Sequence, residues 1–414
     1  MYLSTSVYSV SSQRLEIVHP GTINHFSGPD FNTSKIRCKD ELLVGRTELH
    51  VKTSDFLKHN HQSDAAFNKL LAHVVWEHDM AEDPSGALFT IELKNQCTEE
   101  VLASVKKLLL QDQELACADF AKEVPSIYKQ NMLQSCLVER LEEKANLLRK
   151  DFEQHEIAYV FLQKLAYSLG APVNSFPMEM LMKQFDLKIL FKLGAQQAQL
   201  EALLFGMAGR YNFPLDEYVK QRMQQFEFLK YKFKLKPMSP AVWKNGGMRP
   251  VSHPERILML LASLIAKNAR ALLAWLEFKE IQGLYDYLNI DIPDYWQRHY
   301  QLGKKAKKPI GGLGAAMKSR LIVNCFLPFL FAYGRFVGKT SYEEKAIEFY
   351  EQLKAEQFGI SKQYKNLGFQ LESAGASQGL IQLHRQYCLA KKCLNCQVAN
   401  HRLKKLHEQV KKHS

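Results

Sequence analysis

The 414-residue sequence lacks the long apolar segments and the leader pattern that mark membrane and secreted proteins. Its longest apolar stretches, residues 257–265 and 321–332, contain polar residues or proline, or are shorter than the roughly 20 apolar residues that cross a bilayer. The N-terminal residues show no basic region followed by an apolar one, as a signal peptide would. We therefore expect a cytoplasmic protein with no membrane partner.

The sequence also lacks a disulfide framework and a nucleotide-binding loop. Five of the eight cysteines stand singly, often among apolar residues, which is typical of reduced, buried thiols. The cationic, glycine-rich run at residues 303–314 lacks the Gly-Lys-Ser/Thr ending of a P-loop. We interpret this run as a solvated connector.

What the composition does contain is an ordinary globular balance with a surplus of positive charge. The chain is 46% hydrophobic and 24% charged, which suffices to bury a core, and its length suggests two or three domains. Its formal charge of +12 attracts polyanions at low salt. Nucleic acid is therefore a candidate partner, although such a surplus also serves solubility alone.

The first part of the chain has the pattern of a small mixed sheet with one helix. We expect strands at residues 15–18, 35–44, 46–53, 70–76 and 88–93, and a helix at residues 63–69. Gly45 would supply the turn between the second and third strands. From Glu48 onward the third strand alternates polar and apolar residues, which places Glu48, His50 and Lys52 on one face.

The remainder of the chain is predicted to be helical. Amphipathic stretches with a helical period continue to about residue 357, without a fixed-period repeat. We therefore expect an α+β fold in three parts. These are an α/β domain at residues 1–97, a helical domain at residues 98–357, and a C-terminal helical segment with a cysteine cluster at residues 358–414.

Two acidic residues, Asp30 and Glu48, flank the predicted hairpin. Carboxylates that approach from neighbouring strands can hold Mg²⁺ or Mn²⁺, which orients a phosphodiester and makes a bound water acidic enough to attack it. In Pro29-Asp30 and in Glu48-Leu49-His50 the chain resembles the PD-(D/E)XK nuclease superfamily. The pattern of that family is Pro-Asp, a gap, and then an acid, any residue and a lysine on a strand.

The resemblance implies a nuclease-like N-terminal domain in which Asp30 and Glu48 bind the metal, with Glu16 on the preceding strand as an extra acidic partner. His50 stands where the family has lysine, so a weaker and titratable group would assist the attacking water. Lys52 lies one pleat further along the same face. A plainer interpretation stays open, in which Asp30 caps a turn and Glu48 is a surface residue of its strand.

A second cluster of candidate ligands follows. It comprises His59, His61, Asp64, His73, His78 and Asp79. Histidine is the usual ligand of Zn²⁺ and a common general base. His59 and His61 would lie at the entry to the predicted helix, near the end of the strand that carries His50, so we predict that they bind metal or phosphate. We interpret His73 as a hydrogen-bonded core residue.

Near the C-terminus, His384, Cys388, Cys393 and Cys396 lie in a basic context. His384 and Cys388 are one helical turn apart, and Cys393 and Cys396 have the spacing of a zinc knuckle. Together the four predict a structural Zn²⁺ site. An iron–sulfur cluster is the rival, because this cysteine spacing fits such ligation when a distant fourth cysteine joins. Alternatively, three reduced cysteines pack against a helix, because the usual second Cys-x2-Cys pair is missing.

Several short stretches carry a resemblance over most of the chain. They are His19–Gly21, Gly28–Phe31, Glu48–His50, Ser54–Phe56 with His59 and His61, Ala72–Val75, Leu203–Gly206, Trp243 with Arg249-Pro250, and Ser377–Leu380. In these stretches the chain resembles an uncharacterised bacterial family known only as a domain of unknown function. The resemblance implies a shared architecture and no activity. Within it, we interpret Trp243 as core. The guanidinium groups of Arg249 and Arg256 could pair with phosphate or with a buried carboxylate, and we favour the structural ion pair.

These observations lead to one leading hypothesis and two alternatives. The leading hypothesis is a metal-dependent, phosphodiesterase-type nuclease-like protein that acts on or binds nucleic acid. In it Asp30 and Glu48 bind the metal, His50 assists the water, and His59 or His61 contacts metal or phosphate. The second hypothesis is a non-catalytic nucleic-acid- or protein-binding factor that keeps the fold. The third is a hydrolase of another type that uses the three histidines around Zn²⁺.

Overall fold

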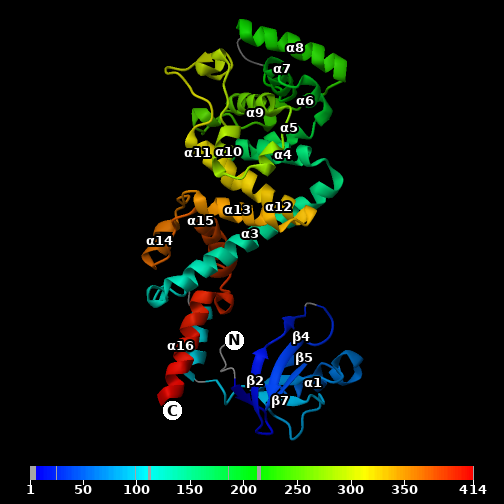
Figure 1. Ribbon diagram of the computed structural model, residues 1–414, viewed down its shortest axis with the longest axis vertical. Helices are drawn as coiled ribbons and strands as arrows, with labels where there is room; N and C mark the ends of the chain where they lie inside the picture. Colours follow the sequence, from blue (N-terminus) through cyan, green and yellow to red (C-terminus); the bar gives the residue numbers. More distant parts are fainter. Residues whose placement is uncertain are drawn as a thin grey trace. The chain divides into compact units, whose positions relative to one another are not determined.

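The computed structural model describes residues 6–24, 26–97, 99–110, 113–184, 186–211 and 216–413. The chain forms two compact units (Figure 1). Unit 1 comprises residues 1–132, 366–369 and 383–414, and unit 2 comprises residues 133–365 and 370–382. A mixed sheet near the N-terminus and a large helical region follow along the chain, which confirms the expected α+β fold.

Unit 1 contains a seven-stranded mixed sheet. Its strands are β1 (Ser6–Tyr8), β2 (Arg14–His19), β3 (Thr22–Ile23), β4 (Phe31–Cys38), β5 (Glu41–Lys52), β6 (Ala72–Glu77) and β7 (Phe89–Glu92). The order is β1-β2-β4-β5-β6-β7, with β3 paired to β4. Strands up to β5 are antiparallel to their neighbours, whereas β5, β6 and β7 run parallel. The parallel half brings the carboxyl ends of β5 and β6 to one edge.

The hairpin between β4 and β5 turns at Lys39 and Asp40, so the predicted turn at Gly45 was wrong. Cys38 pairs with Glu41, and Lys39 adopts a left-handed φ of 53°. Gly45 instead lies inside β5, where a Cβ atom would come within 2.6 Å of the Leu71 Cβ. Glycine is needed there because another chain segment approaches closely, and a local pattern cannot distinguish that need from a turn.

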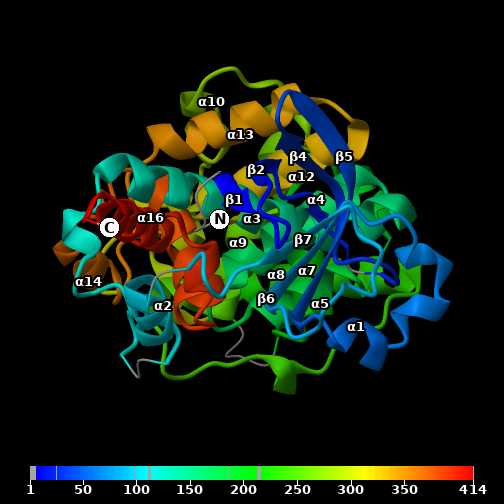
Figure 2. The ribbon, with the colours of Figure 1, turned by 90° about the horizontal axis from the view of Figure 1, so that it is seen from below.

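The segment between β5 and β6 consists of three short helical turns rather than the predicted helix at residues 63–69. They are α1 (Asp55–Lys58), η1 (His61–Ser63) and η2 (Ala65–Phe67), and α1 packs back against β5 (Figure 2). The Asp64 carboxylate accepts a hydrogen bond from the Ala66 backbone N–H, which caps η2. η2 ends after three residues because Asn68 is extended, and the Arg46 guanidinium on β5 binds the Ala66 and Asn68 carbonyl oxygens.

The two faces of the sheet are covered differently. On one face a compact apolar core includes Leu15, Ile36, Leu71, Phe89 and Ile91. A smaller cluster, formed by Phe56, Phe67 and Leu70, lies under the short helical turns. On this second face, the polar side chains of the sheet therefore pack against a small apolar cluster and not against a large core.

The rest of unit 1 is helical. Its elements are α2 (Glu99–Leu110), η3 (Ala121–Glu123), the first turns of α3 (Ser126–Gln154), the π-helical turn η9 (Leu383–Cys388), η10 (Cys393–Asn395) and α16 (Gln397–His413). Leu108 and Ala116 are buried against Ala399 and Leu403. The two ends of this unit, distant in sequence, therefore share a small core.

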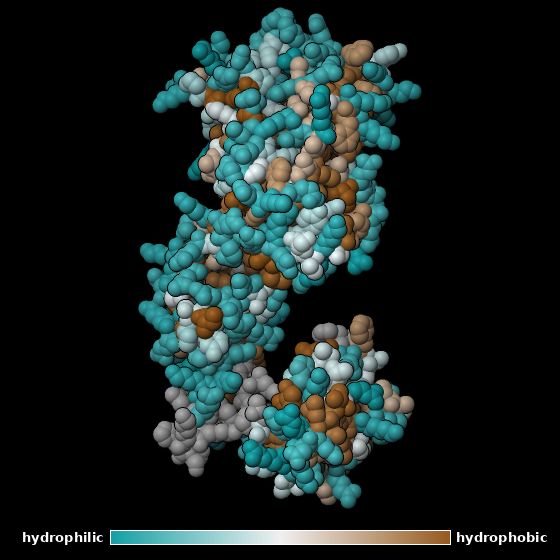
Figure 3. All heavy atoms as spheres, in the orientation of Figure 1, coloured by the Kyte–Doolittle hydropathy of each residue, from teal (hydrophilic) through white to brown (hydrophobic). Residues whose placement is uncertain are grey.

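Unit 2 is built almost entirely from helices around one large apolar core. Its helices are the remainder of α3, α4 (Ile157–Gly170), α5 (Ser175–Met182), α6 (Leu187–Leu193), α7 (Gln197–Met207), α8 (Glu217–Phe233), α9 (Pro254–Asn268), α10 (Ile281–Tyr287), α11 (Ala315–Leu321), α12 (Leu327–Val337), α13 (Thr340–Gln352), α14 (Ser361–Asn366) and α15 (Ala374–Gln382). The π-helical turn η8 (Ile322–Phe326) joins α11 to α12, and a short hairpin, β8 (His299–Gln301) with β9 (Lys304–Lys305), includes the first part of the predicted lysine-rich connector. The space-filling view shows a mostly hydrophilic surface with scattered apolar side chains (Figure 3).

One helical segment of unit 2, Ala315–Val337, is long and apolar enough to cross a membrane by length and composition alone. Most of it is buried inside the protein, which is typical of a core helix. The predicted domain boundaries at residues 97 and 357 stay a prediction, although the first falls between the last strand of the sheet and α2.

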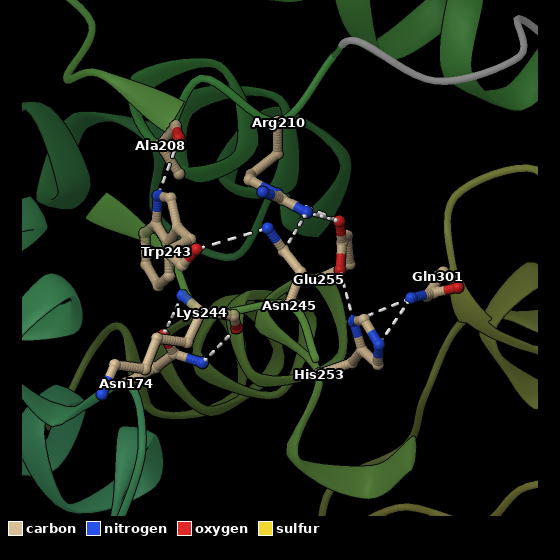
Figure 4. Close-up of polar contacts among 9 residues, drawn as sticks. All are labelled: Asn174, Ala208, Arg210, Trp243, Lys244, Asn245, His253, Glu255 and Gln301. Atoms are coloured by element: carbon tan, nitrogen blue, oxygen red, sulfur yellow. Dashed lines mark hydrogen bonds and ion pairs between the residues drawn. The ribbon is translucent and has the colours of Figure 1, made fainter. Parts of the chain in front are cut away.

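A polar network ties the segment before α9 into unit 2 (Figure 4). The buried Arg210 guanidinium pairs with the Glu255 carboxylate, which has no exposed side-chain surface, and also donates to Asn245. Trp243 is buried, and its indole N–H donates to the Ala208 carbonyl at 2.9 Å. Trp243 therefore belongs to the core, as its sequence context indicates.

Arg256 is also a structural residue. Its side chain is buried, and its guanidinium donates to the Trp296 and Gly311 carbonyl oxygens. Arg256 thus binds backbone carbonyls rather than the carboxylate that an ion pair would need. Arg249 is exposed and precedes the short turn η5 (Pro250–Ser252).

Candidate metal centre

Asp30 and Glu48 lie side by side, and each is held by the backbone next to the other. The Asp30 backbone N–H donates to Glu48 Oε2 at 3.0 Å, and the Leu49 backbone N–H donates to Asp30 Oδ2 at 3.0 Å. Asp30 precedes β4 and Glu48 lies on β5, so the antiparallel pairing of Phe31 with Thr47 creates this contact. One oxygen of Glu48 is thereby engaged, and the other, Oε1, faces the histidines.

Two histidines, His50 and His61, approach that oxygen, and a third, His59, lies next to His50. His50 Nε2 lies 3.2 Å from His59 Nδ1 and 3.7 Å from Glu48 Oε1, and His61 Nε2 lies 3.5 Å from the same oxygen. One ligand atom from each of His50, His59 and His61 falls within 4.8 Å of the others. We call His50, His59, His61 and Glu48 the metal centre.

The local structure explains why these side chains meet. His50 is on β5, and the alternation of the strand turns it to the same face as Glu48. His59 ends α1, and Asn60 adopts a left-handed φ of 58°, which reverses the chain so that His61 faces back toward the sheet. The His61 ring then stacks on Phe67, with 3.9 Å between ring centroids.

A chain of hydrogen bonds behind the metal centre sets the proton positions. His50 Nδ1 lies 2.9 Å from His73 Nε2, and His73 Nδ1 lies 2.9 Å from the Asp83 carboxylate. Thr90 and the Ser85 backbone N–H also donate to Asp83. Burial alone would raise the pKa of Asp83, but these hydrogen bonds outweigh burial and hold the pKa well below its ordinary value.

An anionic Asp83 decides the tautomers of the two rings in front of it. Its carboxylate only accepts, so His73 Nδ1 carries a proton, and in the neutral form of the ring His73 Nε2 then bears a lone pair. His50 Nδ1 must then donate to that lone pair, which leaves His50 Nε2 without a proton. The nitrogen that faces His59, His61 and Glu48 is therefore a lone-pair donor suited to a cation.

Burial strongly perturbs the ionisation of the metal centre. The His50 and Glu48 side chains are only 4% and 6% exposed. Burial raises the pKa of Glu48 to about 7, although the bond from the Asp30 N–H opposes this shift. Burial, together with His73, His59 and His61, lowers the pKa of His50 to about 4. At neutral pH His50 is thus uncharged, and Glu48 is close to its titration point.

The spacing of the donor atoms fits a tetrahedral ion. Zn²⁺ lies about 2.0–2.1 Å from histidine nitrogens, so two ligands at the tetrahedral angle are about 3.3 Å apart. The distance of 3.2 Å between His50 Nε2 and His59 Nδ1 is close to that value. A donor set of three imidazoles suits Zn²⁺ better than Mg²⁺. The Glu48 carboxylate lies beside these donors, with its Oε1 3.7 Å from His50 Nε2 and 3.5 Å from His61 Nε2.

A protein family described as "Protein of unknown function (DUF2851)" matches residues 2–358. The chain belongs to the DUF2851 family. The match contains the whole sheet and the metal centre, and it ends before the C-terminal cysteines. Neither the curated proteins nor the solved structures include a match to the chain.

Other sequence candidates in this DUF2851 chain have different partners. Lys52 pairs with Glu77 at 3.8 Å rather than with the metal centre, and Glu16 pairs with Arg37 at 2.7 Å. His78 Nδ1 bonds the Thr53 hydroxyl. The Asp79 carboxylate binds the Ser54 backbone N–H and hydroxyl, and Asp64 caps η2. The catalytic and metal-binding roles of Asp30, Glu48, His50, His59 and His61 stay predictions.

Sequence reasoning missed Asp83, which controls the histidine chain. Asp83 lies in the loop between β6 and β7, ten residues after the buried His73. An acid in the loop between two strands of a sheet was the only available signal, and many loops contain one. Because the contact depends on how the loop folds back under β6, the sequence pattern does not predict it.

The C-terminal cysteines gain a neighbour that the spacing did not indicate. Burial raises the pKa of the Cys117 thiol to about 12, and the proximity of Cys396 and Cys393 adds to the rise. His384 instead approaches Glu114, with 3.5 Å between His384 Nε2 and Glu114 Oε1. Within the described part of the chain, His50, His59 and His61 are the one group of three or more potential ligands whose donor atoms all lie within 4.8 Å of one another. Zinc or an iron–sulfur cluster at His384, Cys388, Cys393 and Cys396 stays a prediction.

Proposed function

We propose that unit 1 is a divalent-metal-dependent hydrolase that acts on the phosphodiesters of nucleic acid. The observation that carries the proposal is the convergence of three imidazoles and a buried carboxylate at the end of β5. The net charge of +12 supports a polyanionic substrate. The likeness of the β4–β5 hairpin and its two acids to PD-(D/E)XK nucleases supports phosphodiester chemistry.

In this proposal His50, His59 and His61 hold a Zn²⁺ or Mn²⁺ ion. The ion, when bound, polarises a phosphoryl oxygen and acidifies water. The bond from His50 Nδ1 to His73, which Asp83 holds in turn, keeps His50 in the tautomer that offers Nε2 to the ion. Phe56 and Phe67 form the apolar wall that limits ring movement.

Glu48 is the residue that would accept the proton of the attacking water. Its Oε2 is fixed by the Asp30 N–H, and its Oε1 points to the histidines. A pKa of about 7 suits a general base at neutral pH, because the group is then both available and basic enough. Asp30 contributes by holding Glu48 and by its own negative charge next to the centre.

The experiment measures hydrolysis of bis-p-nitrophenyl phosphate and of a single-stranded oligonucleotide by the full chain. The protein is first treated with chelator and then given Zn²⁺, Mn²⁺ or Mg²⁺. We expect metal-dependent cleavage that Glu48→Gln and His61→Ala each reduce by at least ~100-fold. The matched control is His78→Ala, which removes a histidine of the same sheet that binds Thr53 instead.

Two outcomes would defeat the proposal. One is the absence of hydrolysis above the buffer rate with every ion. The other is a Glu48→Gln variant that cleaves as fast as the unaltered chain. Salt-dependent nucleic-acid binding without cleavage would favour the non-catalytic alternative.

A further inference from the structure

Unit 2 contains a cavity of about 770 Å³ that has no part in the metal centre. Residues from α3, α4, α5, α11, η8, α12 and α15 line it. This volume lies within the range of about 300–1,000 Å³ that small-molecule sites occupy. Much of the wall is apolar and includes Leu147, Phe329 and Phe358.

The charged groups of the wall are predominantly cationic. Arg140, Lys144, Lys164 and Arg320 face two carboxylates, Glu179 and Glu356. Four positive charges against two negative charges leave a net charge of +2 on the lining. Such a surplus in a partly apolar cavity is costly unless an anion enters.

Several of these charges have partners of their own. Lys164 pairs with Asp151 at 3.4 Å, and Glu179 pairs with Lys183 at 2.9 Å. On the opposite side Gln378 bridges two residues: its amide oxygen accepts from Arg140, and its amide N–H donates to Glu356. These contacts hold four of the six charged side chains of the wall in place. The other two, Lys144 and Arg320, are both cations.

Lys144 and Arg320 lack an adequate partner. Arg320 Nε is buried and has no hydrogen-bond acceptor within the described parts of the chain. Neither side chain forms an ion pair within 4.0 Å among those same residues, and Glu356 is the carboxylate that interacts with both at longer range. Burial and the neighbouring Arg140 lower the pKa of Lys144 to about 8. Two cations thus lie half-buried in the wall, and removing them from water without a partner costs free energy. A bound dianion would offset this desolvation cost.

The backbone at this wall is also unusual. Arg320 is the last residue but one of α11, two residues before the π-helical turn η8, and Asn324, Cys325 and Phe329 follow it along the same wall. A π-helical turn is rare and is frequent at functional sites. It changes the direction of the side chains that follow, so that residues of η8 and α12 both reach the cavity.

We propose that this cavity binds a small phosphate monoester with an apolar or aromatic body, with Lys144 and Arg320 on the phosphate. A phosphate monoester carries close to two negative charges at neutral pH, which matches the net charge of the lining, whereas a carboxylate carries one. Arginine and lysine are the side chains that bind phosphate best. The apolar wall receives the body of the ligand, and mononucleotides and aryl phosphates have this composition.

The experiment follows the thermal unfolding of the full chain with phenyl phosphate or AMP, and with benzoate or adenosine as probes that lack the phosphate. We expect both phosphates, and neither of the other probes, to raise the melting temperature by several degrees. The variants Arg320→Gln and Lys144→Met should lose this shift, and Arg149→Gln should keep it, because Arg149 is an exposed arginine of α3 paired with Glu153.

The same variants distinguish a ligand site from a structural role. Without any probe, Lys144→Met should melt at the same temperature as the unaltered chain or higher, because an unpaired half-buried cation is removed. A large loss of melting temperature in both variants would show that the cations support the fold, and it would overturn the proposal. No shift with either phosphate, or an equal shift with benzoate, would also overturn it.

Discussion

Asp83→Asn tests the histidine chain without touching the metal centre itself. Asp83 is separated from the proposed ion by His73 and His50, and its carboxylate accepts from His73, Thr90 and Ser85. The asparagine side chain has the same shape, but it is neutral and replaces one acceptor oxygen by a donor. It therefore weakens the constraint that keeps the proton on His73 Nδ1 and away from His50 Nε2.

The expected magnitude follows from these contacts. Loss of the direct partner of a metal-bound histidine typically costs about 10–100-fold in metal affinity. Asp83 acts through His73, so we expect the lower end of this range, about 10-fold or about 1.4 kcal/mol. Loss of the charge from buried hydrogen bonds should cost a further ~1.5–3 kcal/mol of unfolding free energy at neutral pH. Because the pKa of Asp83 lies below its ordinary value, this stability is present at neutral pH and is lost as the pH falls through the folded-state pKa.

Isothermal titration of Zn²⁺ into the chelator-treated chain measures the affinity, and urea denaturation measures the stability. Asp79→Asn is the matched control, because the Asp79 carboxylate binds the Ser54 backbone N–H and hydroxyl near the same sheet edge and bonds no histidine of the centre. An Asp83→Asn protein that is folded and binds Zn²⁺ as tightly as the unaltered chain would refute the tautomer argument. An equal loss in Asp79→Asn would refute it as well.

Two further predictions concern the pH dependence of the centre and the interior of unit 2. Because the pKa of Glu48 is about 7, its carboxyl must lose a proton as the ion binds, so Zn²⁺ affinity should rise from about pH 6 to about pH 8. Titrations across this range should show a flatter profile for Glu48→Gln, and identical profiles would contradict the role of Glu48. In unit 2, Glu255→Ala leaves the buried Arg210 without its carboxylate and should lower the unfolding free energy by about 3–5 kcal/mol. Glu153→Ala, which breaks an exposed pair, should change it by less than ~1 kcal/mol in the same urea titration, and similar losses in both would show that burial of the pair is unimportant.

Much of the candidate site could be predicted because part of it depends on local periodicity. Alternation along one strand is sufficient to place Glu48 and His50 on the same face, and this is how the structure has them. The histidines of the following segment could be predicted as neighbours because only a short connection separates them from that strand. Their exact approach depends on the reversal at Asn60 and on the stacking of His61 on Phe67.

Local patterns failed where a distant segment decided the conformation. Gly45 has the character of a turn residue, yet it is a strand residue because Leu71 packs against it. The predicted helix at residues 63–69 is shortened to η2, and Arg46 on β5 binds the Ala66 and Asn68 carbonyl oxygens at its end. The local preference of a residue is weak enough for tertiary contacts to override it, so the preference alone does not determine the result.

The amino-acid sequence by itself determined the α+β class, the polar face of β5 and the supply of carboxylates and imidazoles, because each depends on residue type and on spacing along one element. Tertiary structure alone decided that Asp83 lies behind His73 and that Cys117 lies near Cys393 and Cys396. It also decided that Arg320 lines a cavity while its buried Nε has no acceptor among the residues that the structure describes. These contacts join residues from different elements, and their positions result from the packing of the whole unit rather than from any local preference.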